Sequence, residues 1–284
     1  MRAYVPDYHL AAPSSLDEAL ALVADQRRPI AGGTDLMVLF EAGKLDDRRL
    51  ISLHALAELR GIVTSSAHVT IGALTTYSEI QRNQTLQREF PLLVRAASWT
   101  GAVATQNRGT LAGNIANASP AADSPPALLV YDAELELIST RGSRWVPYHT
   151  FHTGYKTTTM APDEIIARIR LPRNTSGCIQ YLRKVGTRRA QAISKIALAG
   201  LADVDAGKMS RIRIALASVA PIPLRCVETE RLLVGRALDP TLINEARAKL
   251  SDEIVPIDDI RSTRDYRLQV ASNLLAEFLE SVPA

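Results

Sequence analysis

The chain has 284 residues, of which 46% are hydrophobic and 22% are charged, and its formal net charge at pH 7 is +3. That length can bury an ample core in one large or two modest domains. The low net charge, without a long basic run, argues against nucleic-acid binding, and two cysteines are too few for a disulfide framework or a four-thiolate cluster.

The first part of the chain predicts short helices and strands in mixed order. Ser14-Ser15 precede two acids and apolar residues at helical spacing, so a helix is expected over 16–23. Further helices are expected at 36–42, 54–59, 77–81 and 91–97, and strands at 29–31, 49–53 and in two runs within 62–74.

The second part predicts a change of domain. Residues 172–177 are rich in Pro, Asn, Ser and Gly, and we place a domain boundary there. Before it we expect a helix from 127 and strands at 133–140 and 162–172; after it, strands at 179–185, 196–204 and 212–218 and helices at 228–234, 242–250 and 264–279. Strands and helices of mixed length, without regular alternation, indicate an α+β fold.

A glycine pair lies between an apolar run and a helical pattern in the segment PIAGGTDL, residues 29–36. Successive backbone N–H groups in such a turn, backed by a helix N-terminus, form an anion-binding nest that suits a pyrophosphate. The alternative is a tight turn without a ligand, because glycine first of all supplies backbone freedom.

The stretch richest in binding chemistry is NRGTLAGNIANASPAAD, residues 107–123. Its small residues let the backbone approach a ligand closely, while Thr110, Asn114, Asn117 and Ser119 offer hydrogen bonds. This combination indicates a segment that clamps a cofactor.

Other patterns carry less weight. His149 and His152 lie in expected extended chain without a nearby third ligand, so no metal site is expected there. GxGxxG, GxxxxGK[ST] and the GxSxG nucleophile elbow are all missing, which argues against Rossmann, P-loop and hydrolase sites. Trp99 and Trp145 are expected to be core or interface anchors.

The order and spacing of AGGTDL and of the 107–123 stretch resemble the FAD-binding (medium) subunits of the xanthine dehydrogenase and carbon monoxide dehydrogenase family of molybdenum hydroxylases. The resemblance extends over nearly the whole chain. It implies a two-lobed PCMH/VAO-type FAD-binding domain followed by a smaller α/β C-terminal domain. We place these at residues 1–174, with lobes at about 1–57 and 58–174, and at residues 175–284, the second being CO dehydrogenase flavoprotein-like.

The resemblance also implies which residues bind FAD. We expect binding residues rather than catalytic side chains or metal ligands, because the flavin carries the redox chemistry. The expected residues are Ile30, Ala31, Gly32, Gly33, Thr34, Asp35, Leu36, Gly109, Thr110, Gly113, Asn114, Asn117, Asp123, Ile165, Ile166, Lys184 and Ile193.

Some of these assignments have alternatives. Asp123 is assigned to a ribityl or ribose hydroxyl, but it could instead cap the helix expected near 124–126, and Asp35 has the same ambiguity. Ile165 and Ile166 match an apolar pair that flanks the adenine or the flavin ring in relatives, with strand core as the alternative. Ala112 stands where many relatives have glycine, and its methyl group is expected to weaken a phosphate contact.

The segment from Lys184 to Lys195 resembles the loop that passes the flavin ring and controls access of the electron acceptor. Some relatives carry an acid where this chain has Ala192. With Arg188 and Arg189 nearby, we expect a more positive ring environment that stabilises reduced anionic flavin or attracts an anionic acceptor. A solvated basic loop is the alternative.

The resemblance implies an electron relay. A large molybdopterin subunit oxidises the substrate, a small subunit holds [2Fe-2S] clusters, and FAD on this chain delivers electrons to NAD or another acceptor, in a complex expected to be a dimer of heterotrimers. We expect a soluble, cytoplasmic protein, because neither a signal peptide nor a membrane-length apolar run is visible. The alternatives are a free-standing FAD-dependent reductase or oxidase, and a scaffold subunit without flavin.

Overall fold

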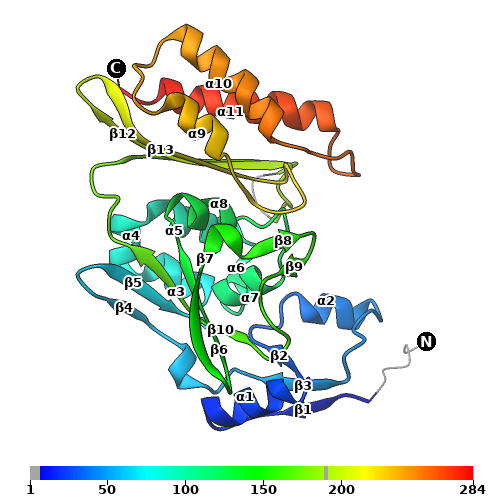
Figure 1. Ribbon diagram of the computed structural model, residues 1–284. Coiled ribbons are helices and arrows are strands. Elements are labelled where there is room, and N and C mark those ends of the chain that lie inside the picture. The colour runs from blue at the N-terminus through cyan, green and yellow to red at the C-terminus, as the bar shows by residue number, and fades with distance from the viewer. Residues whose placement is uncertain (1–6, 189–190, 284) are drawn as a thin grey trace.

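The computed structural model describes residues 7–188 and 191–283. Figure 1 shows the C-terminal strands and helices stacked above the rest of the chain, with the N-terminal strands at the opposite end. None of the helices in these ranges combines the length and apolar character needed to cross a membrane.

The N-terminal part is a small parallel sheet with two helices. Its strands pair in the order β1 (His9–Ala11), β3 (Arg49–Ser52), β2 (Arg28–Ile30). α1 (Leu16–Ala24) begins after Ser15, whose hydroxyl accepts a hydrogen bond from the Glu18 N–H. α2 (Leu36–Glu41) follows β2 after a loop of residues 31–35.

A five-stranded antiparallel sheet forms the middle of the molecule. Its order is β4 (Ile62–Thr64), β5 (His68–Gly72), β10 (Ile165–Pro172), β6 (Glu134–Ser139), β7 (Gly142–Pro147). The central strand β10 is mostly buried, as expected for a strand paired on both sides. The short elements beside this sheet are η1 (Ala57–Leu59), α3 (Tyr77–Arg82), α4 (Gln84–Glu89), α5 (Pro91–Trp99), α6 (Val103–Gln106), α7 (Leu111–Ala116), α8 (Pro125–Val130), η2 (Tyr148–Thr150), β8 (His152–Gly154) and β9 (Thr157–Thr158).

The C-terminal part is a four-stranded antiparallel sheet under three helices. The strands are β11 (Ile179–Val185), β12 (Ile196–Asp205), β13 (Lys208–Ala217) and β14 (Leu224–Arg225), and the helices are α9 (Val227–Leu233), α10 (Pro240–Glu253) and α11 (Arg264–Glu280). On β12, Leu198 and Ala202 pack with the helices, while Ala199 and Leu201 belong to the core of the larger part. Both faces of this sheet are therefore buried.

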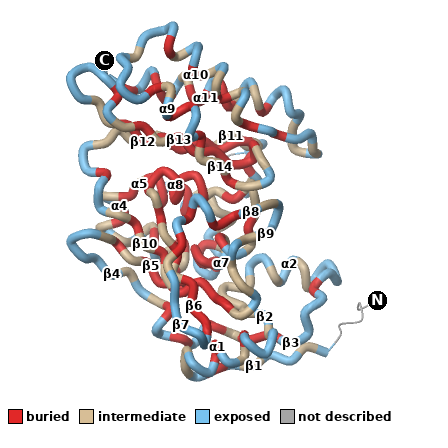
Figure 2. The backbone as a smooth tube through the Cα atoms, viewed as in Figure 1, coloured by how far each residue is buried: buried red, intermediate tan, exposed pale blue. Residues whose placement is uncertain are grey.

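The helix α8 joins the two parts. All six of its residues are buried, and Figure 2 shows it as a red run between the two sheets. Arginines of the C-terminal sheet satisfy its last carbonyl groups: Arg213 Nη1 donates to Val130 O at 2.9 Å and Arg225 Nη1 to Leu129 O at 3.1 Å. Asp132 forms ion pairs with both arginines. Polar contacts at the C-terminal end of α8 therefore connect the two parts of the chain.

The predicted α+β class is confirmed, as is most of the predicted element order. The structure adds α4, α6 and α7, which were not predicted, and the helix expected at 54–59 is wrong except for the single turn η1. β10 ends at Pro172 and β11 begins at Ile179, so the predicted boundary lies between the two sheets. The exact domain and lobe limits stay predictions.

Candidate functional site

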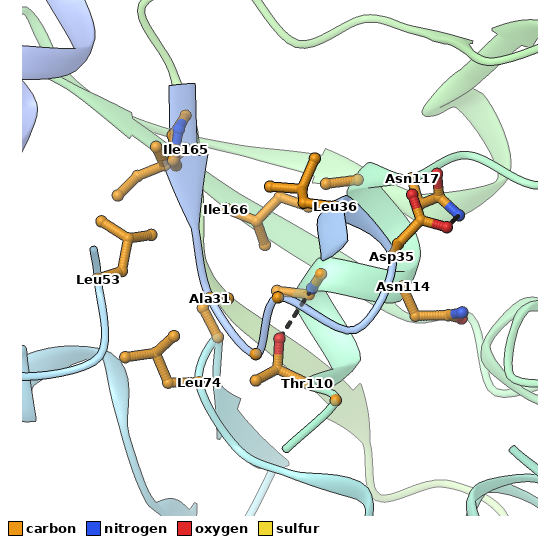
Figure 3. Close-up of a pocket in the computed structure, with 18 of the residues that line it drawn as sticks. Ala31, Asp35, Leu36, Leu53, Leu74, Thr110, Asn114, Asn117, Ile165 and Ile166 are labelled. Atoms are coloured by element: carbon orange, nitrogen blue, oxygen red, sulfur yellow. Dashed lines mark hydrogen bonds between the residues drawn. The ribbon is translucent and has the colours of Figure 1, made fainter. Parts of the chain in front are cut away.

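A cleft of about 550 Å³ opens between the loop after β2 and the start of α7. Its walls come mainly from segments 28–36, 73–77, 100–117 and 160–166, which lie far apart in the sequence. Figure 3 shows Asp35, Asn114 and Asn117 together at one end of the cleft, and Ile165, Leu53 and Leu74 at the other. The cleft therefore has a polar end and an apolar end.

The loop after β2 presents unpaired backbone donors. The N–H groups of Gly32, Gly33, Thr34 and Asp35 donate no hydrogen bond to any residue in the described ranges. Gly33 has φ +74°, a left-handed conformation that glycine adopts without strain. Consecutive N–H groups in such a turn form an anion-binding nest. Asp35 is the N-cap residue of α2, but its side chain makes no capping hydrogen bond.

The loop lies directly against the segment that leads to α7. A Cβ atom on Gly32 would overlap the carbonyl oxygen of Arg108 and lie 2.6 Å from its carbonyl carbon. On Gly109, a Cβ would lie 3.0 Å from the Thr105 carbonyl oxygen and 3.2 Å from the Tyr77 ring. Only glycine fits at these two crossings without a shift of the neighbouring backbone.

The opposite wall is fixed by its own hydrogen bonds. Thr110 caps α7 by accepting from the Gly113 N–H at 3.1 Å. The Tyr77 N–H donates to the Gly109 carbonyl at 3.2 Å, and the Leu111 N–H donates to the Thr75 carbonyl at 3.1 Å. Across the cleft entrance, Asn117 Nδ2 donates to Asp35 Oδ1 at 3.2 Å (Figure 3). The two walls therefore keep a fixed separation.

Among the described residues, one buried polar atom of the cleft lining is left for a ligand. Asn114 Oδ1 has no hydrogen-bond partner there, whereas the Tyr77 hydroxyl interacts with the side chains of Ser124 and Thr100. Burial raises the pKa of Tyr77 well above its usual value, so its hydroxyl stays protonated. Buried polar groups without partners are rare in native proteins. Together with the nest and the apolar end, this atom suits an anionic ligand that also carries flat rings.

Comparisons with known proteins agree with this chemistry. A family model described as "FAD binding domain in molybdopterin dehydrogenase" matches residues 6–174, and one described as "CO dehydrogenase flavoprotein C-terminal domain" matches residues 181–282. The chain belongs to this family of FAD-binding subunits. It is thus a subunit of an oxidoreductase of the xanthine and carbon monoxide dehydrogenase type.

Relatives of the FAD-binding subunit align along almost its whole length. The xanthine dehydrogenase FAD-binding subunit of Escherichia coli O157:H7 is 31% identical over 283 residues, covering 98% of this chain and 96% of that protein. The glyceraldehyde dehydrogenase medium chain of Sulfolobus acidocaldarius is 31% identical over 281 residues, covering 98% and 99%. In the structure of carbon monoxide dehydrogenase from Hydrogenophaga pseudoflava, one chain superimposes with a TM-score of 0.93 at 28% identity, with 98% of each chain covered.

Most residues predicted to bind FAD from the sequence lie on this cleft. Those that line it are Ala31, Gly32, Gly33, Thr34, Asp35, Leu36, Gly109, Thr110, Gly113, Asn114, Asn117, Ile165 and Ile166. Ile165 and Ile166 also belong to the buried core of the strand. They therefore have both of the positions considered for them, on the cleft lining and in the strand core. Ala112 lines the cleft as well and is buried.

The remaining predicted residues lie outside the cleft lining. Ile30 ends β2, and Ile193 is 63% exposed. Asp123 is bound on both oxygens, by Lys184 Nζ at 2.7 Å and by the Ser194 hydroxyl at 2.7 Å. Burial raises the pKa of the Asp123 carboxyl, and Lys184 opposes that shift. The capping alternative for Asp123 is wrong, because Ser124 is the N-cap residue of α8.

The loop predicted to pass the flavin ring is only partly described. Arg188 Nε and Nη2 both donate to the Gln191 carbonyl, at 3.0 and 2.5 Å, so this side chain folds back on its own loop. Arg189 lies outside the described residues.

Several cleft residues had no signal in the sequence. Tyr77, Thr100 and Thr105 reach the cleft only because the segment 107–111 lies beside the turn before α3. Met160, Ala161 and Pro162 reach it because they precede β10, which pairs with β5. No local pattern marks residues that become neighbours through sheet pairing.

The two histidines of the pair lie in different environments. His152 is buried and its Nε2 lies 3.1 Å from the Tyr148 hydroxyl, whereas His149 is exposed. Within the described residues, no group of three or more His, Cys, Asp or Glu side chains is placed to hold a metal ion. Burial lowers the pKa of His152 to about 4.

We predict that Gly32→Ala weakens FAD binding by about 5- to 150-fold, because the new methyl group forces the nest away from the Arg108 carbonyl at a cost of about 1–3 kcal/mol. Flavin titration by fluorescence measures the effect. Gly207→Ala is the control: it places alanine at φ +74° in open space, in the β12–β13 turn, and should lower stability but leave FAD affinity unchanged. If Gly32→Ala bound FAD as tightly as wild type, the close contact between Gly32 and the Arg108 carbonyl would not shape the site.

We also predict that His152 makes the fold acid-sensitive. Its folded-state pKa lies below the unfolded value of 6.5, so its stabilising contribution is complete above pH 6.5 and is lost as the pH falls toward about 4. With partial solvent screening the loss is about 1–2 kcal/mol. Urea unfolding at pH 7 and pH 4.5 should show a smaller pH effect in His152→Gln than in wild type. The exposed His149→Gln should behave like wild type; equal pH effects in all three proteins would contradict the prediction.

Proposed function

We propose that this cleft binds FAD, with the diphosphate held at the nest. The observation that carries the proposal is the run of unpaired N–H donors from Gly32 to Asp35. Four consecutive N–H donors without a partner in the described part of the chain are expected where an anion completes the hydrogen bonding. Gly109, Thr110, Gly113 and Asn114 would approach the diphosphate from the opposite wall, and the methyl group of Ala112, which also lines the cleft, would weaken one of these contacts.

The apolar end would take a ring of the cofactor. Ile165, Leu53 and Leu74 line it, and removal of such surface from water favours binding of a flat aromatic group. Asn117 and Asp35 would contact the cofactor at the entrance. Asp123 still has free lone pairs for a ribityl or ribose hydroxyl, because each of its oxygens accepts one protein hydrogen bond.

The proposed role is electron transfer within a larger enzyme. Bound FAD supplies one- and two-electron redox chemistry, while this chain binds it, orients it and limits its access. Electrons would arrive from [2Fe-2S] clusters on a small subunit and leave to NAD or another acceptor. The chain has two cysteines, whereas each cluster takes four ligands, so the clusters belong on a partner.

Partner subunits are also proposed from the names of the relatives. Three relatives named as medium chains or FAD-binding subunits, of dehydrogenases for xanthine, glyceraldehyde and carbon monoxide, are 31%, 31% and 30% identical to this chain. Equal similarity to proteins with different substrates is expected if a large molybdopterin subunit selects the substrate. We propose a dimer of heterotrimers, located in the cytoplasm, where the free thiols Cys178 and Cys226 remain reduced.

The first test is to purify the chain with its natural partners, record the visible spectrum and identify the flavin released on denaturation. We expect about one FAD per chain and co-purification of a molybdopterin subunit and an iron-sulfur subunit. A lone flavoprotein that reduces its own substrate would instead support a free-standing reductase. Colourless protein that also fails to take up added FAD would leave a scaffold role.

The loop of residues 186–195 supplies a second test. We predict that Ala192→Asp makes the flavin midpoint potential more negative by on the order of 20 mV, because a nearby negative charge opposes addition of electrons by about 1 kcal/mol. Ala192→Asn controls for the change of size. Redox titration of both variants, with rates of reduction of anionic and neutral acceptors, makes the measurement. Unchanged potential and unchanged acceptor rates in Ala192→Asp would reject a charge effect of this loop.

A further inference from the structure

A second hollow, of about 290 Å³, lies beside the FAD cleft. It shares Ala31, Gly32, Leu74 and Thr110 with the cleft, so the two are separated by the loop after β2. Gly109 and Gly113 line only the cleft. The second hollow has its own polar lining, which includes His54, Arg60, Ser78, Glu79, Arg82, Asn107 and Arg108.

This lining has an excess of positive charge. Arg60, Arg82 and Arg108 come from three separate segments, and Glu79 is the single carboxylate among the residues that line the hollow. Glu79 is already engaged, because its Oε2 accepts from both the N–H and the hydroxyl of Thr76 at 2.7 Å. Three cations around one small hollow repel one another unless an anion lies between them.

The arginines have donors to spare. Arg82, an exposed residue at the end of α3, makes no hydrogen bond or ion pair with any residue in the described ranges. Toward the residues that the structure describes, Arg108 donates only through Nε, to the Gly32 carbonyl at a long 3.4 Å, and Arg60 uses Nη2 toward His54. Asn107 Oδ1 accepts from the Ser78 hydroxyl, which leaves the Asn107 amide N–H groups as further donors. The hollow is therefore rich in free donors, and its single carboxylate already accepts two hydrogen bonds from Thr76.

We propose that this hollow is an anion-binding site, separate from the FAD cleft, that takes a phosphate group. Guanidinium groups match the oxygens of phosphate through paired hydrogen bonds. A hollow of this size is close to the lower limit of small-ligand pockets, so it suits a compact anion better than a protein segment. The phosphate is either free inorganic phosphate or part of a nucleotide.

The test uses purified protein, with and without saturating FAD, titrated with inorganic phosphate by calorimetry at low ionic strength. We expect one site with the same affinity in both states, and at least about tenfold weaker binding in Arg82→Gln and in Arg60→Gln. The control is Arg88→Gln, an exposed residue on the neighbouring helix α4 that does not line the hollow; it should bind like wild type. Displacement of phosphate by ADP would assign the phosphate to a nucleotide, and no displacement would assign it to the free anion.

Four results would overturn the proposal. The first two are that wild type does not bind phosphate, or that it binds phosphate with an affinity that Arg82→Gln does not change. Binding that FAD abolishes would make the hollow a part of the cofactor site. Loss of a partner subunit from Arg82→Gln, without phosphate binding in wild type, would assign these arginines to a protein contact instead.

Discussion

The close approach of the Gly32 backbone to the Arg108 carbonyl is the constraint on which the site depends. It brings the loop after a parallel strand against a segment that is 76 residues away in the chain. A larger residue at 32 would separate the two, and the nest would no longer face α7. The same crossing divides the FAD cleft from the arginine-lined hollow. One glycine contact thus determines the shape of two neighbouring binding surfaces.

The C-terminal part is held to the rest by charge as well as by apolar packing. Arg225 pairs with Asp132 on the neighbouring part and with Glu230 on α9, and it also donates to the last turn of α8. Glu230 in turn accepts from the Ile214 N–H at 2.7 Å. Burial raises the pKa of Glu230, and Arg225 opposes that shift. A buried network of this kind fixes orientation, because loss of one member leaves an uncompensated charge.

The sequence predicted most of the order of elements and most of the residues that line the cleft. Glycines in a turn and amides in a small-residue stretch are local signals, and Gly32, Gly33, Thr110 and Asn114 do come together at one cleft. Tyr77 and Met160 could not be found in this way, because only the pairing of β5 with β10 and the crossing at 107–111 bring them there. Helix α7 was not predicted, because residues 111–116 include Gly113 and Asn114, which are poor helix formers.

Asp123 connects the 107–123 stretch to the loop of residues 186–195. Lys184 precedes that loop and Ser194 lies near its end, and both donate to the Asp123 carboxylate, so one side chain holds both ends. The Ser218 hydroxyl donates to the Ser194 carbonyl, and the Ser218 backbone N–H donates to the carbonyl of Pro120, which lies in the 107–123 stretch. The ends of the loop are therefore fixed relative to the cleft, while Ile193 stays exposed. A buried carboxylate is costly, and its position here is explained if the loop must keep a constant distance from the bound cofactor.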